Sequence, residues 1–318
     1  MRIAIVGGSI AGLAMGWALK EKGMKATVYE RSRGHLTHRG AGVMLAPEVA
    51  SMLELTSRKV EQRLVLNEDL AVVWQRPVAK RAVLWADVYM KLRERSEGVE
   101  LLDGCRVTEI RQNPLQFTVG AQRQEADLVI GADGLGSVVR GLVDPDFQPE
   151  YLGYTAIRGV VPRDRLPKTL PPVFESLFDN GMAQIFLRGE HITAYGLPSD
   201  PPVLNWMWYK NTTLDKLDEY LTDREGKKHR WSIPPHGLSQ SVEQSLRQAA
   251  AEQLPAGLGE LVAATDDIFL QPIYCGSAAR NYKGNVILIG DAAHLAVPHA
   301  GAGVSLAIKD ALALAETL

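Results

Sequence analysis

The feature that most constrains the fold lies at the start of the chain, where a short apolar run leads into a glycine-rich turn. Residues 2–6 become apolar and β-branched after Arg2, which is typical of a strand buried on both faces of a parallel sheet. The turn over residues 7–12 reads Gly-Gly-Ser-Ile-Ala-Gly, and helical character then continues to a capping Gly23. Because residues 25–30 again have strand character, this order predicts a β-α-β unit.

The residue types in this turn point to a dinucleotide. Glycines permit a tight turn and a close backbone approach to a pyrophosphate, whose charge is favoured by the amides and dipole of a helix N-terminus. An acid about 20 residues further on accepts hydrogen bonds from a ribose, and Glu30 lies 18 residues after Gly12. Ser9 stands where a glycine is usual, but it is also small. The alternative is a structural turn in a nucleotide-free α/β protein, and the motif alone does not distinguish FAD from NAD. The predicted cofactor-binding residues of this unit are Gly7, Ser9, Ile10, Ala11, Gly12, Glu30 and Arg31.

Two further glycine-rich turns follow buried apolar runs. One reads Gly-Ala-Asp-Gly-Leu-Gly over residues 131–136, and the other reads Gly-Asp-Ala-Ala-His over residues 290–294. Taken singly, an aspartate after a buried strand is more often a helix cap than a ligand. In this order and spacing, the three turns together are a much more specific signal than any one of them alone.

From about residue 150 the sequence changes character. Short segments rich in β-type residues and separated by Pro, Gly and Asp turns indicate an antiparallel sheet. These segments are 154–161, 174–178, 182–187, 191–197 and 204–210. Helices are predicted near 214–222 and 241–253, the second with capping-box spacing between Ser241 and Gln244. Residues 55–80 give no clear prediction.

The motif order predicts how the domains are assembled. We expect an α/β protein whose nucleotide-binding domain is discontinuous, made of residues 1–150 and 266–318. A second domain with an antiparallel sheet, residues 151–265, is inserted between these two parts.

Composition narrows the classes of function. Lys and Arg number 35 and Asp and Glu 37, so the net charge of −2 offers nucleic acid no electrostatic attraction. No uncharged apolar run reaches the roughly 18 residues needed to span a bilayer. Cys105 and Cys275 are too few for a disulfide framework and lack metal-ligand spacing. We therefore expect a cytoplasmic protein with a small-molecule substrate and no metal.

With these motifs in place, the chain resembles the class A flavoprotein monooxygenases of the p-hydroxybenzoate hydroxylase fold, and within them the 2,6-dihydroxypyridine 3-monooxygenase subgroup. The first turn is similar to the FAD fingerprint of the family. Three short motifs are similar to those of the subgroup: Gly-Tyr at 153–154, Arg-Gly at 158–159 and Pro-His at 298–299. The resemblance covers nearly the whole chain. It implies a Rossmann-like FAD-binding domain with an inserted antiparallel-sheet substrate domain.

The resemblance also implies cofactor contacts. Asp133 matches a motif that touches both flavin and nicotinamide cofactor in the family, and Asp291 matches the aspartate that holds the flavin ribityl chain. A helix beginning near Gly301 would direct its N-terminal dipole at the flavin pyrimidine edge. Arg39 is preferred to Arg33 as the arginine near the pyrophosphate. The cofactor-binding candidates added in this way are Asp133, Gly134, Gly290, Asp291, Gly301, Ala302, Gly303 and Arg39.

The implied activity is hydroxylation of an electron-rich aromatic or hydroxypyridine ring through a C4a-hydroperoxyflavin, with O2 as oxidant. The chain has no second dinucleotide fingerprint, so NAD(P)H would bind transiently as a co-substrate. A histidine has the right unperturbed pKa to remove a substrate hydroxyl proton. By position the catalytic candidates are His299, the neighbouring Pro298, which would form a wall of the cavity, and His294.

Two alternatives stay open at the level of sequence. One is an FAD-dependent oxidase or dehydrogenase that inserts no oxygen, and the other is a truncated, non-catalytic flavin-binding protein. The second follows from the end of the chain at Leu318, where members of the family continue for several more helices. With those helices missing we expect an exposed apolar face, and with it a homodimer or a lower stability.

Overall fold

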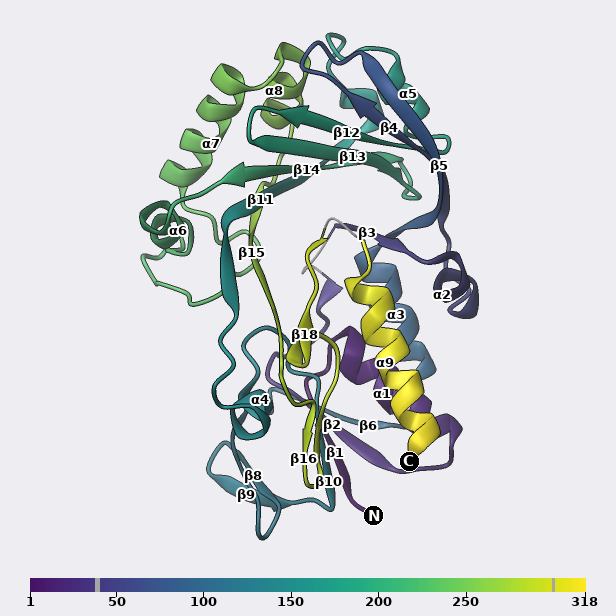
Figure 1. Cartoon of the computed structure of the whole chain (residues 1–318), viewed down its shortest axis with the longest axis vertical. Helices are drawn as coiled ribbons and strands as arrows, with labels where there is room; N and C mark the ends of the chain where they lie inside the picture. Colours follow the sequence, from purple (N-terminus) through teal and green to yellow (C-terminus); the bar gives the residue numbers. More distant parts are fainter. Residues whose placement is uncertain (38–40, 299–300) are drawn as a thin grey trace. The chain divides into compact units, whose positions relative to one another are not determined.

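The computed structural model describes residues 1–37, 41–298 and 301–318, and the chain forms two compact units. The first unit consists of Met1–Thr37, Ala86–Glu150 and Tyr274–Leu318, and the second of His38–Trp85 and Tyr151–Ile273. Figure 1 shows the chain passing between them, since β11 (Glu150–Pro162) begins in the first unit and β15 (Phe269–Ser277) ends in it.

The first unit is built on a six-stranded sheet in the order β16-β17-β10-β1-β2-β6. Neighbouring strands are parallel except β16, which is antiparallel to β17. The central strand β1 is buried at every residue, as its apolar sequence requires. The strands are β1 (Ile3–Val6), β2 (Ala26–Glu30), β6 (Glu100–Asp103), β10 (Leu128–Gly131), β16 (Tyr282–Lys283) and β17 (Val286–Leu288).

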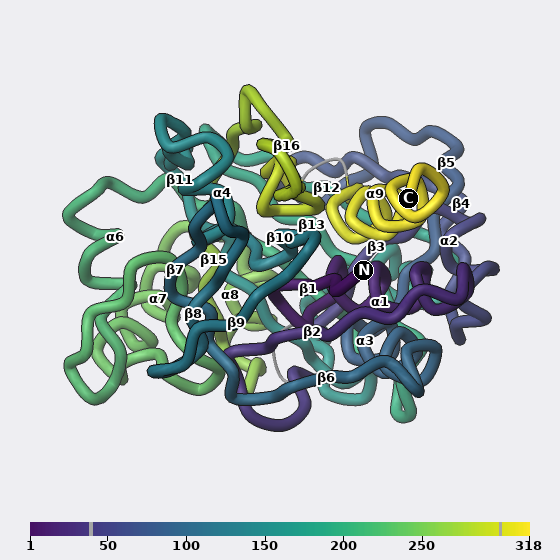
Figure 2. The backbone as a smooth tube through the Cα atoms, turned by 90° about the horizontal axis from the view of Figure 1, so that it is seen from below, coloured from purple at the N-terminus to yellow at the C-terminus, as the bar shows by residue number. Residues whose placement is uncertain are grey.

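The helices of this unit pack closely because they carry small residues. α1 (Ile10–Glu21) is buried from Ile10 to Leu19, so it is covered on more than one side. One cover is α9 (Gly303–Thr317), which lies beside α1 in both Figure 1 and Figure 2. A Cβ on Gly290 would lie 3.0 Å from the Cβ of Ala11 and 3.3 Å from that of Ala307, so the turn at Gly290 fits between the two helices only as glycine.

The remaining elements of the first unit are short. A three-stranded sheet has the order β7-β8-β9, with β7 (Val107–Arg111), β8 (Gln116–Val119) and β9 (Gln122–Glu125). The other elements are α3 (Trp85–Arg95), α4 (Val138–Val143), a 3-10 turn at Gly290–Ala292, and β18 (His294–Leu295), which pairs with the end of β15.

The second unit is built on a large sheet, mostly antiparallel, in the order β15-β11-β14-β13-β12-β4-β5-β3. Trp206 and Trp208 of β14 are almost fully buried in the core on one face, among residues of α7 and α8. Met182, Tyr195 and Met207 belong to the layer on the other face. The strands not yet given are β3 (Gly42–Leu45), β4 (Arg58–Leu66), β5 (Val72–Leu84), β12 (Gly181–Leu187), β13 (Glu190–Leu197) and β14 (Val203–Asn211). The helices are α2 (Pro47–Met52), α5 (Val173–Ser176), α6 (Leu214–Tyr220), α7 (Gln240–Gln253), α8 (Ala256–Ala263) and a 3-10 turn at Arg163–Arg165.

The predicted fold class is confirmed: a Rossmann-like α/β domain is interrupted by an antiparallel-sheet domain. The division of the chain differs from the predicted one at residues 38–85, which lie in the second unit and not with the nucleotide-binding residues. The reason is that β4 and β5, in the stretch that gave no clear prediction, extend the large sheet beyond β12.

Two local predictions are wrong. Residues 174–178 were expected as a strand but form α5 and its end, because Pro171 and Pro172 favour a helix start and Phe174, Leu177 and Phe178 then face one core at helical spacing. The N-cap of α7 is Ser239, whose hydroxyl accepts from the amide of Val242, and not Ser241.

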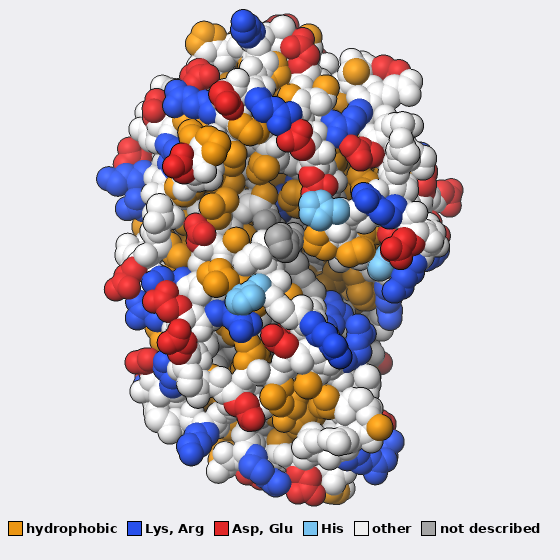
Figure 3. Space-filling model, turned by 180° about the vertical axis from the view of Figure 1, so that it is seen from behind, with side chains coloured by type: hydrophobic (Ala, Val, Ile, Leu, Met, Phe, Trp, Pro, Cys, Tyr) orange, Lys and Arg blue, Asp and Glu red, His pale blue; other side chains and the backbone are white. Residues whose placement is uncertain are grey.

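The surface carries charges of both signs. On the face drawn in Figure 3, Lys and Arg side chains alternate with Asp and Glu, in keeping with the net charge of −2. In the described part of the chain, no helix has the length and apolar character to cross a membrane.

Candidate functional site

The strand order brings the predicted turns to one edge of the parallel sheet. The chain runs from β1 to β2 and β6 on one side, and then returns to β10 and β17 on the other side of β1. In open parallel sheets, ligands bind beyond the carboxyl ends of the strands where the order reverses in this way. Gly7, Glu30, Asp133 and Gly290 follow or end four of these strands, so they share that edge.

The first turn presents backbone rather than side chains. Gly7 has a φ of +106°, and a Cβ there would lie 2.3 Å from the carbonyl oxygen of Ala132. A Cβ on Gly12 would lie 1.8 Å from the carbonyl oxygen of Gly7, and one on Gly8 would lie 2.7 Å from the Cβ of Glu30. Glycine is therefore the residue that fits at all three positions, and the turn forms a smooth cradle.

The helix that starts from this cradle is not capped by a side chain. Ser9 is the N-cap of α1 with an extended backbone, and its hydroxyl makes no capping hydrogen bond. The first turn of α1 also contains no acidic residue. Its amides therefore remain for an anion bound from outside, and the helix dipole favours such an anion.

Glu30 joins the end of β2 to the cradle. Its side chain is 5% exposed, Oε2 accepts from the amide of Gly8 at 2.8 Å, and Oε1 accepts from the amide of Ser32 at 2.8 Å. Each carboxylate oxygen can accept a second hydrogen bond, so the group retains acceptor capacity for a ribose hydroxyl.

Asp133 acts in this structure as a cap for α4. Its carboxylate accepts from the hydroxyl of Ser137 and from the amides of Val138, at 2.7 Å, and Val139, at 3.3 Å. Burial raises the pKa of Asp133 above its usual range, and these donors act in the opposite direction. The next residue, Gly134, has a φ of +74°, a conformation that glycine adopts readily.

The turn after β17 is held from α9. Asp310 accepts from the amide of Gly290 at 2.9 Å and contacts Nε2 of His294 at 2.7 Å through the same oxygen, Oδ2. The hydrogen bond to Asp310 raises the pKa of the His294 imidazole, and burial acts against this rise. Asp291 differs from both, because it is exposed and no hydrogen bond to its carboxylate is found among the described residues.

Arg140 ties the two aspartate turns together, and sequence reasoning missed it. Arg140 is 5% exposed, and its guanidinium donates to the carbonyl oxygens of Gly134 and Leu135 in one turn and of Asp291 and Ala292 in the other. The contacts to the second turn span about 150 positions of sequence, so no local pattern could reveal them.

The other predicted residues are distributed around this edge. Arg31 is exposed beyond β2, Pro298 is half-buried, and Ala302 is the N-cap of α9 with no side-chain cap. Gly301 has a φ of +54° and Gly303 is the first residue of α9. Arg39 and His299 lie outside the described residues.

In the second unit, a row of side chains crosses the sheet from strand to strand and includes two polar groups. Strand register places Asn205, Tyr195 and Met182 directly opposite one another on β14, β13 and β12. Asn205 is fully buried, and its Oδ1 accepts from the amide of Gly42 at 3.3 Å, but its Nδ2 has no hydrogen-bond partner among the described residues. A buried donor without a partner is costly and is rare in folded proteins.

Aromatic side chains next to this row remain protonated. Burial raises the pKa of Tyr209 to about 12, and burial raises that of Tyr195 still further, although Arg158 partly opposes both shifts. The ring of His191 stacks on Tyr209, with centroids 4.4 Å apart, and Phe186 stacks on His191 at 5.7 Å. This sheet face therefore combines flat aromatic groups with hydroxyl and amide donors.

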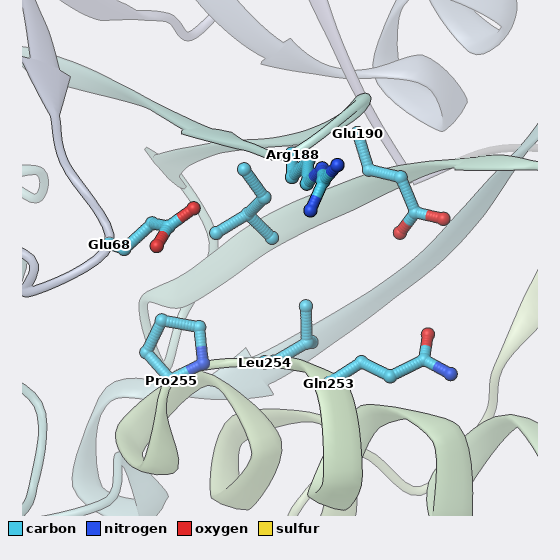
Figure 4. A pocket seen from close by; sticks show the side chains of 7 residues that line it. Glu68, Arg188, Glu190, Gln253, Leu254 and Pro255 are labelled. Carbon is cyan, nitrogen blue, oxygen red and sulfur yellow. The ribbon is translucent and has the colours of Figure 1, made fainter.

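A separate cavity of about 480 Å³ lies beside the end of α7 (Figure 4). It is lined by Glu68, Leu187, Arg188, Glu190, Gln253, Leu254 and Pro255. The carboxylate of Glu190 accepts from Trp208 Nε1 at 2.7 Å and pairs with Lys210 at 3.3 Å. Since these partners satisfy its buried charge, we assign the cavity no part in the site.

Comparisons with known proteins agree with this geometry. Residues 5–36 match an NAD(P)-binding Rossmann-like domain, residues 151–274 an FAD binding domain-like family, and residues 243–318 an FAD binding domain. The 2,6-dihydroxypyridine 3-monooxygenase of Paenarthrobacter nicotinovorans is 32% identical over 99% of this chain and 82% of its own length. A 3-amino-4-hydroxybenzoate 2-monooxygenase of Streptomyces platensis is 28% identical over 100% of this chain and 79% of its own.

Solved structures give the same result. The 2,6-dihydroxypyridine-3-hydroxylase from Arthrobacter nicotinovorans superposes with a TM-score of 0.89 at 29% identity, over 99% of this chain and 83% of that one. Klebsiella pneumoniae HpxO, solved with FAD and uric acid, has a TM-score of 0.77 at 18% identity, over 99% and 79% of the two chains, and so shares the fold.

Proposed function

The chain belongs to the class A FAD-dependent monooxygenases, and from that premise we propose that it hydroxylates an electron-rich hydroxylated aromatic or hydroxypyridine ring with NAD(P)H and O2. The observation that carries the proposal is the 32% identity to the Paenarthrobacter enzyme across 82% of that enzyme. The relatives named above act on a dihydroxypyridine and an aminohydroxybenzoate. What these rings share is an electron-donating hydroxyl group.

The cradle of the first unit fits FAD. When bound, FAD accepts electrons from NAD(P)H and activates O2 for transfer to the ring. The glycine turn over residues 7–12 would admit the pyrophosphate to the uncapped amides of α1, and Glu30 would accept from the ribose. The exposed Asp291 is available to hold the ribityl chain, and Asp133 would act mainly by shaping its turn.

We assign the substrate to the sheet face that carries Asn205 and Tyr195. The unpartnered Nδ2 of Asn205 would donate to an oxygen of the ring, and the protonated Tyr195 hydroxyl provides a second donor beside it. The surrounding methionine and tyrosine side chains exclude water and present flat surfaces for the ring.

The histidines have different proposed roles. His299 remains the candidate base for the substrate hydroxyl, with Pro298 as the wall beside it. Because the ring of His294 is engaged by Asp310, we propose that it acts by orienting the turn that carries Asp291.

A turnover assay tests the proposal. Purified protein loaded with FAD should consume NAD(P)H slowly alone and much faster with a suitable phenol or hydroxypyridine, giving a product with one more oxygen. Protein freed of FAD is the control. Stable FAD binding without substrate-stimulated consumption across a broad panel of such rings would contradict the proposal.

We also propose that the protein works in the cytoplasm, where NAD(P)H is supplied. The half-buried thiols of Cys105 and Cys275 are unpaired in the structure, which suits a reducing compartment. The predicted homodimer stays a prediction, which sedimentation analysis of the purified protein would test.

A further inference from the structure

The cross-strand row that carries Asn205 and Tyr195 continues into two arginines. Met182 of β12 lies opposite Arg63 of β4, and Arg63 lies directly opposite Arg76 of β5. Because side chains directly opposite one another in a sheet share a face, the two guanidinium groups lie on the same face as the proposed substrate site.

Within the described part of the chain, this arginine pair has no counter-ion. No hydrogen bond or ion pair to either guanidinium is found there. The Nε of Arg63 is buried and has no partner in residues 1–37, 41–298 and 301–318, and burial together with the neighbouring Arg76 lowers the pKa of Arg63. Arg76 lies over the exposed ring of Trp74, with 5.7 Å from its guanidinium carbon to the ring centroid.

Like charges directly opposite each other destabilise a sheet, and an unpartnered buried donor adds to that cost. An oxyanion held between the two groups would remove both costs, since guanidinium groups bind carboxylate and phosphate with two parallel hydrogen bonds. The cost is thus explained if a ligand, and not the protein, supplies the negative charge.

We propose that Arg63 and Arg76 form an oxyanion-binding subsite of the substrate face. Strands lie about 4.8 Å apart, so Tyr195 and Arg63, two strands apart, are separated by about 10 Å at the backbone. A benzene ring with an oxygen at one end and a carboxylate at the other spans that gap once the arginine side chain is included. The subsite therefore selects an aromatic acid, and this choice of substrate class rests on the proposed function.

Ligand binding to the FAD-loaded enzyme tests the subsite without turnover. Benzoate should bind at least tenfold more tightly than the isosteric, neutral benzamide, as measured by calorimetry. Arg63→Gln and Arg76→Gln should each remove this preference while leaving benzamide binding and the flavin spectrum unchanged.

The control comes from the same hairpin. Lys59 and Arg81 are also directly opposite one another, but on the other face of β4 and β5. Lys59→Gln and Arg81→Gln remove the same charge and should leave the preference for benzoate intact. Equal losses in these two variants, or no preference in the unmodified enzyme, would overturn the proposal.

A second arm identifies the source of the oxyanion. One outcome is that inorganic phosphate displaces benzoate and that Arg63→Gln raises the KM for NAD(P)H. This outcome would support the subsite and assign it to the phosphates of the nicotinamide cofactor. A raised KM for an acidic aromatic substrate alone would assign it to the substrate carboxylate. Because benzoate binding is measured without reaction, an enzyme that bound benzoate but hydroxylated nothing would contradict the proposed function and not the subsite.

Discussion

Glu30 is the residue whose contacts test the proposed cofactor site most directly. Its buried carboxylate accepts from the amide of Gly8 in the glycine turn and from the amide of Ser32, which follows β2. It therefore fixes the position of two backbone segments and, at the same time, offers acceptor capacity to a ribose.

Glu30→Gln should weaken FAD binding by about ten- to a hundredfold, because a hydrogen bond to a charged group contributes about 1.5–3 kcal/mol. Titration of the apoprotein with FAD, followed by flavin fluorescence, measures this change. Glu21→Gln, at the exposed end of α1, is the matched control and should bind FAD normally. Unchanged affinity in Glu30→Gln would show that the carboxylate does not serve the cofactor.

The ion pair of His294 and Asp310 makes stability depend on pH. Asp310 raises the pKa of His294, so the stabilisation is fully present below the unfolded pKa of about 6.5 and is lost as pH rises through the folded pKa. Asp310 has the opposite dependence on pH, because its pKa is lowered in the folded protein. The stabilisation that it contributes is present above about pH 4 and is lost as pH falls through the folded pKa.

His294→Gln should therefore lower Tm most near pH 5.5–6.5 and progressively less at alkaline pH. At its largest, the loss in the free energy of unfolding should reach about 1 kcal/mol. Melting curves of both proteins across pH 5.5–9 measure the difference. A difference in Tm that grew with rising pH would contradict the assignment of the ion pair.

At the scale of elements, the first turn could be predicted because every signal is local. Gly7, Gly12 and Glu30 lie within one β-α-β unit, and their spacing alone was enough to propose roles for them in cofactor binding. The contacts of Arg140 and Asp310 could not be predicted in this way, because they join segments that become neighbours only when β10, β17 and α9 assemble.

The strands β4 and β5 were missed for a different reason. They are rich in basic residues and contain register shifts near Val60 and Val65, so the apolar–polar alternation that identifies a strand is broken. The same residues carry the arginine pair. The register that places Arg63 opposite Arg76 is set by the partner strands and cannot be read from either segment alone.

The close approach at Gly12 gives a test at this scale. Gly12→Ala places a Cβ 1.8 Å from the carbonyl oxygen of Gly7, so we expect a loss of about 2–3 kcal/mol in the free energy of unfolding and little bound FAD. In the same helix, the added methyl of Gly16→Ala would lie 3.2 Å from a methyl of Val99 and 3.4 Å from a methyl of Val28, and a small shift of the Val99 side chain relieves the closer contact. Urea unfolding and flavin content measure both variants, and equal behaviour of the two would contradict the cradle geometry.

At the scale of the molecule, the motif order at the two ends of the chain was enough to predict a discontinuous nucleotide-binding domain with an insertion. It could not show that residues 38–85 leave this domain, because that depends on which sheet β4 and β5 join. The polar row from Asn205 to Arg76 likewise exists only in the assembled sheet, since its members come from five strands.

Insertion of oxygen into an aromatic ring is the step that distinguishes the proposed monooxygenase from an oxidase or dehydrogenase. The most direct measurement is turnover of the FAD-loaded enzyme with NAD(P)H, a hydroxylated aromatic substrate and ¹⁸O₂, followed by mass spectrometry of the product. We expect one labelled oxygen atom in each product molecule and one NAD(P)H consumed for it. An oxidised product without label, as an oxidase or dehydrogenase would give, would contradict this expectation.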